Sequence, residues 1–402
     1  MQRCHLEVAD ILKEHGGEFL RRCQVTATSV LDVMGAILQC RTAALGGHLS
    51  VCLDCGKSHQ SYNSCRNRHC PKCLGSKTAE WMEKRSKELL PIPYFHVVFT
   101  LPHEFNPLAL RNKARVYDIL LRTAWQTLQE VAANPKHLGA QIGAFGILHT
   151  WNQTLQLHPH VHFVVTGGGL SKDKSRWISS RNPKFFAPVR VLQKVFRGKF
   201  IDALKQDYAA GKLSCIGSTA ELNTPKTFEK LLNCACSKPW NVYCKPPLHG
   251  KTETLKYLAS YTHRIAISNQ RLLTLQQGEV TFSYRDSADG CQRKNMTLPA
   301  VEFIRRFMLH IVPKNFYRIR HFGFLANAYR TQHLKLAQAL LIASQTPTEH
   351  EPEHKQIPGQ TAQYVCQDCG SSNLIRIPLS SPALAVVINT TRTADNNYWD
   401  SS

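Results

Sequence analysis

The 402-residue sequence has few acidic residues and no hydrophobic run long enough to cross a membrane. It contains 28 Asp and Glu residues against 50 Lys and Arg, which gives a formal net charge of +22. The segment Met1–His5 also lacks the apolar core of a secretory signal. We therefore expect a soluble intracellular protein with no membrane partner.

A nucleotide-binding loop is also missing. Gly250-Lys251-Thr252 has the ending of a P-loop, but Lys245 stands where that motif requires its first glycine. No nucleotide cofactor is therefore expected. The positive charge is spread over the whole chain and favours a polyanionic partner such as nucleic acid.

Fifteen cysteines without a secretory signal favour metal ligation over a disulfide framework. Six of them fall between Cys40 and Cys73. Two CxxC pairs, Cys52/Cys55 and Cys70/Cys73, are separated by fourteen residues, which is close to zinc-ribbon spacing. We predict that these two pairs together bind one structural zinc ion.

Other potential ligands leave this zinc site open to a different assignment. Cys65, His69, Cys40 and His48 are surplus candidates, so either a second ion or an alternative ligand set is possible, with Cys65 and His69 as the alternative zinc ligands. Near the carboxyl terminus, the pair Cys366/Cys369 has no second pair downstream. It is a half-site that is as compatible with inert thiols as with metal binding.

Two histidines at alternate positions of an apolar segment indicate a catalytic metal site. In the motif H-P-H-V-H at 158–162, His160 and His162 point to the same face of a strand. Two neutral imidazoles in this arrangement can bind one divalent metal ion. A polar strand face without metal is the alternative interpretation of the same pattern.

About a hundred residues later, Tyr257 and Tyr261 lie one helical turn apart on a shared face. Tyrosines with this spacing are often core or interface residues. Together with a histidine metal site, however, they suggest metal-assisted attack of a phenol on a phosphodiester.

The patterns along the chain predict four regions: residues 1–77, 78–271, 272–345 and 346–402. The second is an α+β region, with strands expected at 94–101, 142–150 and 161–166 and helices at 116–131 and 191–209. A hairpin is expected over 271–284 and a helix over 300–310. The tail contains the second CxxC half-site and is partly disordered by composition.

Three motifs in this order resemble those of HUH endonucleases, named for two histidines that flank an apolar residue. They are F-T-L-P at 99–102, H-P-H-V-H at 158–162, and Tyr257-x-x-x-Tyr261. Further stretches resemble the two-tyrosine rolling-circle transposases of the insertion sequence 91 family: N-S-C-R-N-R-H-C-P-K-C at 63–73, Y-T-H-R-I-A-I-S-N at 261–269 and R-I-R-H-F-G-F at 318–324. The resemblance extends to about Leu341.

That resemblance implies a zinc-binding amino-terminal domain (1–77) followed by an HUH catalytic domain (78–271), an antiparallel sheet with flanking helices that includes the two-tyrosine helix. Residues 272–345 form a basic carboxyl-terminal region, and 346–402 form the tail. It further implies a transposase of the prokaryotic cytoplasm and nucleoid, which nicks and rejoins single-stranded DNA at transposon ends and joins it to target DNA.

The site residues follow from the same resemblance. Tyr257 and Tyr261 are the expected nucleophiles, and His160 and His162 are expected to hold Mg²⁺ or Mn²⁺. The third metal ligand of HUH enzymes is not marked by a motif here. His149 is our candidate, and His158 is the alternative.

Basic residues near these motifs are candidates for contacts to DNA phosphates. This set comprises Arg66, Arg68, Lys256, Arg264, Arg318 and Arg320. Two other functions remain open at this point. One is a metal-dependent phosphodiesterase without a covalent intermediate, and the other is a non-catalytic zinc-ribbon protein that binds nucleic acid.

Overall fold

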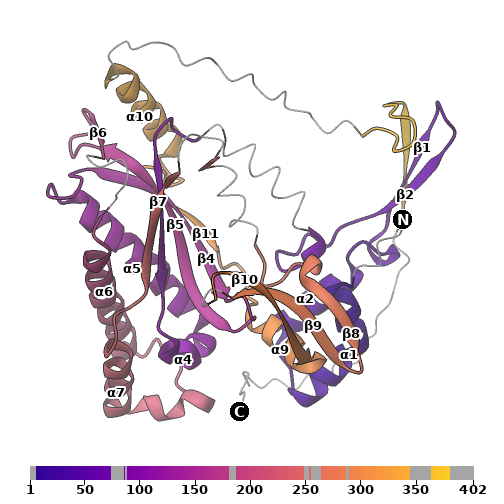
Figure 1. The fold of residues 1–402 in the computed structure, drawn as a ribbon, viewed down its shortest axis with the longest axis horizontal. Coiled ribbons are helices and arrows are strands. Elements are labelled where there is room, and N and C mark those ends of the chain that lie inside the picture. The colour runs from indigo at the N-terminus through magenta and orange to yellow at the C-terminus, as the bar shows by residue number, and fades with distance from the viewer. Residues whose placement is uncertain are drawn as a thin grey trace.

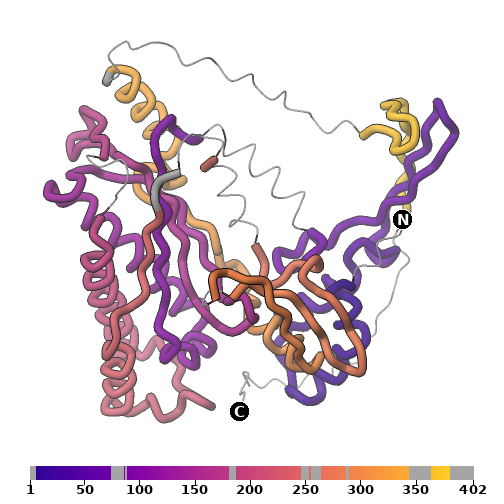
Figure 2. Tube along the Cα trace, in the orientation of Figure 1, coloured from indigo at the N-terminus to yellow at the C-terminus, as the bar shows by residue number. Residues whose placement is uncertain are grey.

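The computed structural model describes residues 6–73, 86, 88–180, 187–248, 253–254, 264–286, 289–344 and 364–380. Three antiparallel sheets organise these parts of the chain (Figures 1 and 2). The largest sheet and its helices form one body. A second sheet packs with the amino-terminal helices, and a third, small sheet projects from that second body.

The six-stranded sheet is the centre of the larger body. Its strands run in the order β11-β4-β5-β3-β7, and β6 pairs with β5. Their bounds are β3 (Tyr94–Thr100), β4 (Gln141–Trp151), β5 (Leu157–Leu170), β6 (Trp177–Ser179), β7 (Val242–Leu248) and β11 (Ile319–Gly323). Long β4 and β5 form the middle hairpin, so the residues on these two strands have neighbours on both sides.

Helices cover one face of this sheet. They are α4 (Asn106–Arg111), α5 (Lys113–Ala133), α6 (Val189–Ala209) and α7 (Pro225–Cys236). Val161, Phe163 and Val165 of β5 point into the core beneath these helices. Because strand side chains alternate, the even-numbered residues of β5 point to the opposite face.

That opposite face is covered at one end by α10 (Arg330–Ser344). Phe145 of β4 and Val164 of β5 pack there with Leu334 and Ala337 of the helix. His160 and His162 have the same parity as Val164, so the strand alternation places them on this second face as well.

The second body combines the amino-terminal helices with a later part of the chain. Its elements are α1 (Val8–Arg22), α2 (Thr28–Gln39), β8 (Leu272–Gln276), β9 (Glu279–Asp286), β10 (Gln292–Pro299) and α9 (Ala300–Leu309), which share one hydrophobic core. Gln277 and Gly278, with φ angles of 51° and 76°, form the tight turn between β8 and β9.

The third sheet joins distant parts of the sequence. β1 (Gly47–Cys52) pairs on one side with β2 (Ser58–Tyr62) and on the other with β12 (Leu374–Leu379). The register between β1 and β12 runs from Gly47 opposite Leu379 to Cys52 opposite Leu374. Figure 1 shows this sheet at the tip of the projection, with yellow β12 beside indigo β1.

The predicted α+β fold with antiparallel sheets is confirmed. Each of the three predicted strands in 94–166 is present, although β5 extends to Leu170, and both predicted helices and the hairpin occur. The region 272–345, predicted as one unit, divides between the two bodies: β8–β10 and α9 pack with α1 and α2, whereas β11 and α10 join the large sheet. Across the described ranges, every helix is too short or too polar to span a membrane.

Candidate metal centres

Four histidines on three neighbouring strands lie on the sheet face opposite α5 and α6. His149 comes from β4, His160 and His162 come from β5, and His96 comes from β3. His149 is the cross-strand partner of His160, and Val98 is that of His162. The antiparallel register therefore brings together side chains that are far apart in the sequence.

Three of these histidines could hold one metal ion. His149, His160 and His162 each offer a ring nitrogen, and the three nitrogens lie within 4.8 Å of one another. The rings are tilted steeply, with interplanar angles of 62° between His149 and His162 and 69° between His160 and His162. His149 and His162 are buried and His160 is half-buried, so the cluster opens toward the surface on the side of His160.

Hydrogen bonds select the nitrogens that are available for a metal. His160 Nδ1 donates to the carbonyl oxygen of His158 at 2.6 Å, which leaves Nε2 as the potential ligand. His162 Nδ1 lies 2.9 Å from Nε2 of His96, and the two rings are stacked. The alternative ligand His158 therefore contributes through its backbone in the arrangement observed here.

The surroundings keep these rings neutral, as metal ligation requires. Burial lowers the pKa of His160 to about 4 and the pKa of His162 well below the ordinary value. The nearby positive charge of Arg264 acts in the same direction on the pKa of both histidines. A neutral imidazole with a free nitrogen is the form that binds divalent metal ions.

The donor set fits a divalent ion. Three ring nitrogens converge from two strands, and His160 is the one partly exposed member of the set. Both expected ions, Mg²⁺ and Mn²⁺, favour oxygen ligands, so a phosphate or water would have to complete the coordination beside the three imidazoles.

The predicted DNA-contacting arginines differ in their surroundings. Arg68 donates to the carbonyl oxygens of Phe316 and Pro313, at 2.5 and 2.8 Å, and so fastens its loop to a segment whose Phe316 packs in the core of the larger body. Arg320 forms an ion pair with Asp118 at 2.6 Å. These two guanidinium groups already bind protein oxygens, which a short sequence motif does not reveal.

Arg264 and Arg318 lie closer to the histidines. Arg318 Nη1 donates to the carbonyl oxygen of Arg264 at 3.4 Å, and Leu148, beside His149, donates through its backbone to Arg318. Arg66 is exposed and has a φ of 54° in the cysteine-rich loop. Tyr257, Tyr261 and Lys256 lie outside the described residues.

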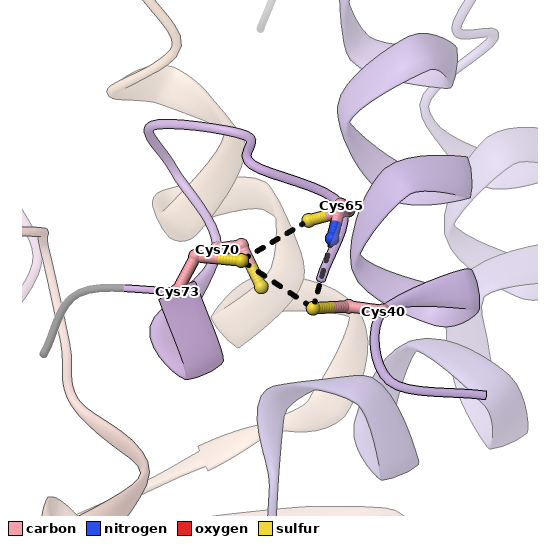
Figure 3. A group of neighbouring side chains, drawn as sticks. All are labelled: Cys40, Cys65, Cys70 and Cys73. Atoms are coloured by element: carbon pink, nitrogen blue, oxygen red, sulfur yellow. Dashed lines mark hydrogen bonds between the residues drawn. The ribbon is translucent and has the colours of Figure 1, made fainter. Parts of the chain in front are cut away.

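Four cysteines of the amino-terminal region form one compact cluster (Figure 3). They are Cys40, at the end of α2, and Cys65, Cys70 and Cys73, which belong to the loop after β2. Cys73 Sγ lies 3.5 Å from the sulfurs of both Cys40 and Cys65. The backbone N–H groups of Cys65 and Asn67 donate to Cys40 Sγ and Cys65 Sγ, so two of the four sulfurs also accept backbone hydrogen bonds.

The predicted pairing of the two CxxC motifs around a single zinc is not the arrangement found. Cys70 and Cys73 cluster with Cys40 and Cys65, whereas Cys52 and Cys55 lie beside the distant Cys366/Cys369 pair. Neither cluster includes His48 or His69. Spacing along the chain identified the ligand types but not their partners, because a loop can place a CxxC pair against any neighbouring element.

An antiparallel sheet with a histidine cluster on the face opposite α5 and α6, next to a cysteine-rich region in a strongly basic chain, is typical of metal-dependent proteins that act on nucleic acid. Comparisons with known proteins narrow this class. Residues 143–333 match a family model described as "Putative transposase", and residues 11–101 match one described as "Transposase zinc-binding domain".

Two curated proteins are similar over most of the chain. A putative transposase, y4qJ, of Sinorhizobium fredii is 43% identical over 386 residues, covering 94% of this chain and 96% of that protein. The transposase for insertion sequence element IS801 of Pseudomonas savastanoi pv. phaseolicola is 31% identical over 345 residues, covering 84% and 78%. The chain belongs to the insertion sequence 91 family of transposases, and its amino-terminal region is the zinc-binding domain of that family.

Among solved structures, the metal-bound complex of the conjugative relaxase TrwC with oriT DNA is similar to 42% of this chain and 71% of its own. The TM-score is 0.23 and the identity 14%, a similarity too low to bear on the site. The sequence motifs do not include His96. It lies in the predicted strand 94–101, but only the register of β3 against β5 places it on the face of His162.

Proposed function

We propose that this transposase nicks and rejoins single-stranded DNA at transposon ends, and joins it to target DNA, through phosphotyrosine intermediates. The observation that best supports this proposal is the convergence of His149, His160 and His162 on the sheet face opposite α5 and α6. His160 and His162 of the H-P-H-V-H motif therefore have a third potential metal ligand, His149, as a metal-dependent phosphodiester reaction needs.

In this mechanism, His149, His160 and His162 would hold a divalent ion, Mn²⁺ or Mg²⁺. Such an ion would supply polarisation of the scissile phosphate and stabilisation of the leaving oxygen. Arg264, whose charge reaches the histidines, favours a phosphate beside them. His158, through its carbonyl, keeps His160 in the tautomer that presents Nε2.

Tyr257 or Tyr261 supplies the nucleophile. A phenol has an ordinary pKa near 10, so its oxygen attacks efficiently only a strongly polarised phosphate. The tyrosine oxygen forms a bond to phosphorus and releases its proton to water. The bond from phosphorus to the 3′ oxygen breaks, and that oxygen takes up a proton from water to become a free 3′ hydroxyl. Two tyrosines allow two covalent ends, which is what transfer of a strand from one site to another needs.

The test is the formation of a covalent adduct. Wild-type protein incubated with Mn²⁺ and a labelled oligonucleotide of the transposon end should give a labelled protein band that survives denaturation. Tyr257→Phe/Tyr261→Phe should abolish the band, because the rings remain and the nucleophilic oxygens are lost. The control Tyr317→Phe/Tyr329→Phe changes two exposed tyrosines, 75% and 63% accessible, and should keep it.

The outcomes separate the proposal from its two competitors. Cleavage without an adduct would identify a phosphodiesterase that does not use tyrosine. DNA binding without any cleavage, unchanged in His160→Ala, would identify a non-catalytic binding protein. Normal adduct formation by the double tyrosine variant would rule out the tyrosine mechanism.

A further inference from the structure

The second cysteine cluster is built from two copies of one short motif. Cys52–Gly56 reads C-L-D-C-G, and Cys366–Gly370 reads C-Q-D-C-G. They come from opposite ends of the chain, and Cys55 and Cys366 are 311 positions apart. The shared pattern indicates that the two segments fold in the same way.

The backbone confirms this equivalence. In each motif, the glycine N–H donates to the carbonyl oxygen of the first cysteine, at 2.9 Å in one and 3.0 Å in the other. In each, the first cysteine donates to the carbonyl of the residue after the glycine, at 2.9 and 2.7 Å. Gly56 and Gly370 have φ angles of 71° and 76°, which a glycine adopts without strain. Both segments are therefore the same tight turn with two thiols inside.

The two turns face each other with their sulfurs inward. Cys52 Sγ lies 3.6 Å from Cys369 Sγ, and Cys55 Sγ lies 3.6 Å from Cys366 Sγ. All four sulfurs lie within 4.8 Å of one another. In a tetrahedral site with zinc–sulfur bonds near 2.3 Å, the sulfurs are about 3.8 Å apart. The spacing in this cluster matches that geometry and is well beyond a disulfide bond.

Each turn also holds the other through its aspartate. Asp54 accepts hydrogen bonds from Asn373 Nδ2, at 2.8 Å, and from the hydroxyl of Ser371. Asp368 forms an ion pair with Lys57 at 3.1 Å and contacts His59. This reciprocal exchange orients the two turns around the sulfurs, as outer contacts of metal ligands commonly do.

We propose that Cys52, Cys55, Cys366 and Cys369 bind a second structural Zn²⁺, separate from the cluster that contains Cys40. This ion fastens the segment 364–380 to the amino-terminal hairpin of β1 and β2. The small sheet needs such a fastening because none of its Leu, Ile and Val side chains is fully buried. Ile375 and Ile377 are 49% and 46% accessible. The inference does not depend on the cleavage chemistry.

Metal content is the first test. Purified full-length protein should contain two zinc ions per chain, and Cys366→Ser/Cys369→Ser should contain one. The control Cys234→Ser/Cys291→Ser removes two exposed cysteines outside both clusters and should keep two. Two zinc ions in Cys366→Ser/Cys369→Ser would overturn the proposal, as would iron in place of zinc in the wild type.

The second test works on the wild-type cysteines and decides the matter if the double variant does not fold. A specific protease site is inserted in the full chain between residues 345 and 363, and the protein is cleaved there. The fragment containing residues 364–402 should co-elute with the rest of the chain on gel filtration and separate after zinc is chelated under reducing conditions. A fragment that separates before chelation, or that stays bound after complete zinc removal, would overturn the proposal.

Discussion

At the level of single residues, the contact between His96 and His162 determines which nitrogen of His162 can take a metal ion. The two nitrogens, Nε2 of His96 and Nδ1 of His162, lie 2.9 Å apart, so one of them donates to the other. If His162 Nδ1 donates, its Nε2 is the nitrogen that can act as a metal ligand. His96 then acts as a positioning residue for the proposed site.

Replacement of His96 should weaken metal binding. We expect His96→Ala to lower Mn²⁺ affinity about 10- to 100-fold, the usual effect of losing a partner of a metal ligand. His96→Asn, which retains an acceptor oxygen, should recover part of this loss. Titration of each full-length variant with Mn²⁺, monitored by electron paramagnetic resonance, measures the two affinities. His103→Ala, at a histidine that is 82% exposed, is the matched control.

Full Mn²⁺ affinity in a folded His96→Ala variant would contradict the positioning role. A merely structural role would lower thermal stability in both His96 variants and leave Mn²⁺ affinity unchanged in the folded fraction. The comparison that decides between these roles is the Mn²⁺ affinity of His96→Ala against that of His96→Asn.

His310 makes folding sensitive to acid. Its Nδ1 accepts from the hydroxyl of Thr150 at 3.2 Å, and its Nε2 donates to the carbonyl oxygen of Leu155 at 3.0 Å. Burial, and then the charge of Lys113, lower the pKa of this histidine to about 3. The folded state therefore holds His310 neutral at a pH where the unfolded chain protonates it.

The sign of the pH effect follows from this difference. The stabilisation is fully present above the unfolded pKa of about 6.5 and is lost as the pH falls toward 3, by at most about 1.4 kcal/mol per pH unit from this group. His310→Gln should flatten the pH dependence of the free energy of unfolding in this window. Urea unfolding at pH 7 and pH 5 measures the change, and an equal slope in both proteins would contradict it.

At the level of elements, the loop after β2 holds three of the four cysteines of the first cluster, Cys65, Cys70 and Cys73. We expect Cys65→Ser to remove the zinc of this cluster and to destabilise the second body, because Cys40 at the end of α2 loses its shared ion. His69→Gln should keep that zinc, since His69 is buried outside the cluster.

Zinc content and amide hydrogen exchange of α1 and α2 measure these two variants. Faster exchange should accompany zinc loss in Cys65→Ser. Zinc loss in His69→Gln with full zinc in Cys65→Ser would reverse the ligand assignment.

The strands were predictable from sequence because alternation of apolar residues reports directly on burial. Val161, Phe163 and Val165 line one face, which left His160 and His162 on the other. His96 was not predictable in this way, because its place beside His162 depends on the register of β3 against β5.

The ligand partners of the cysteines were not predictable for a related reason. A CxxC pair fixes the relative positions of two thiol ligands. The tertiary fold decides which two residues supply the other two ligands of the site. The contacts of Arg68 and Arg320 likewise depend on protein oxygens supplied by distant segments, at 313–316 and at Asp118. The presence of six cysteines between positions 40 and 73 did predict metal binding in this region. It did not predict that these cysteines belong to two separate clusters.

At the level of the whole molecule, the charge of +22 should make DNA affinity strongly dependent on salt. Each phosphate contact releases counterions, and the slope of log affinity against log salt is about −0.7 per contact for single strands. We expect Arg264→Gln to reduce this slope by about 0.7. Arg320→Gln should leave it unchanged, because that side chain is paired with Asp118.

Fluorescence anisotropy with a labelled single-stranded oligonucleotide, at several salt concentrations, measures the slopes. A flat wild-type curve would contradict phosphate binding as the role of the charge. Equal slopes in the two arginine variants would contradict the distinction between these side chains.

The sheet of β1, β2 and β12 has a consequence for the order of events during synthesis. The hairpin at residues 47–62 leaves the ribosome early, but its partner strand begins at Leu374. At about 5–20 residues per second, roughly 15–60 seconds pass between the two. During that interval the larger body can fold, whereas β1 waits with one edge unpaired. A chain that stops short of Cys366, through a nonsense codon or a frameshift in a decaying copy of the element, never completes this sheet. Completion of the sheet thus distinguishes a fully translated transposase from a truncated one.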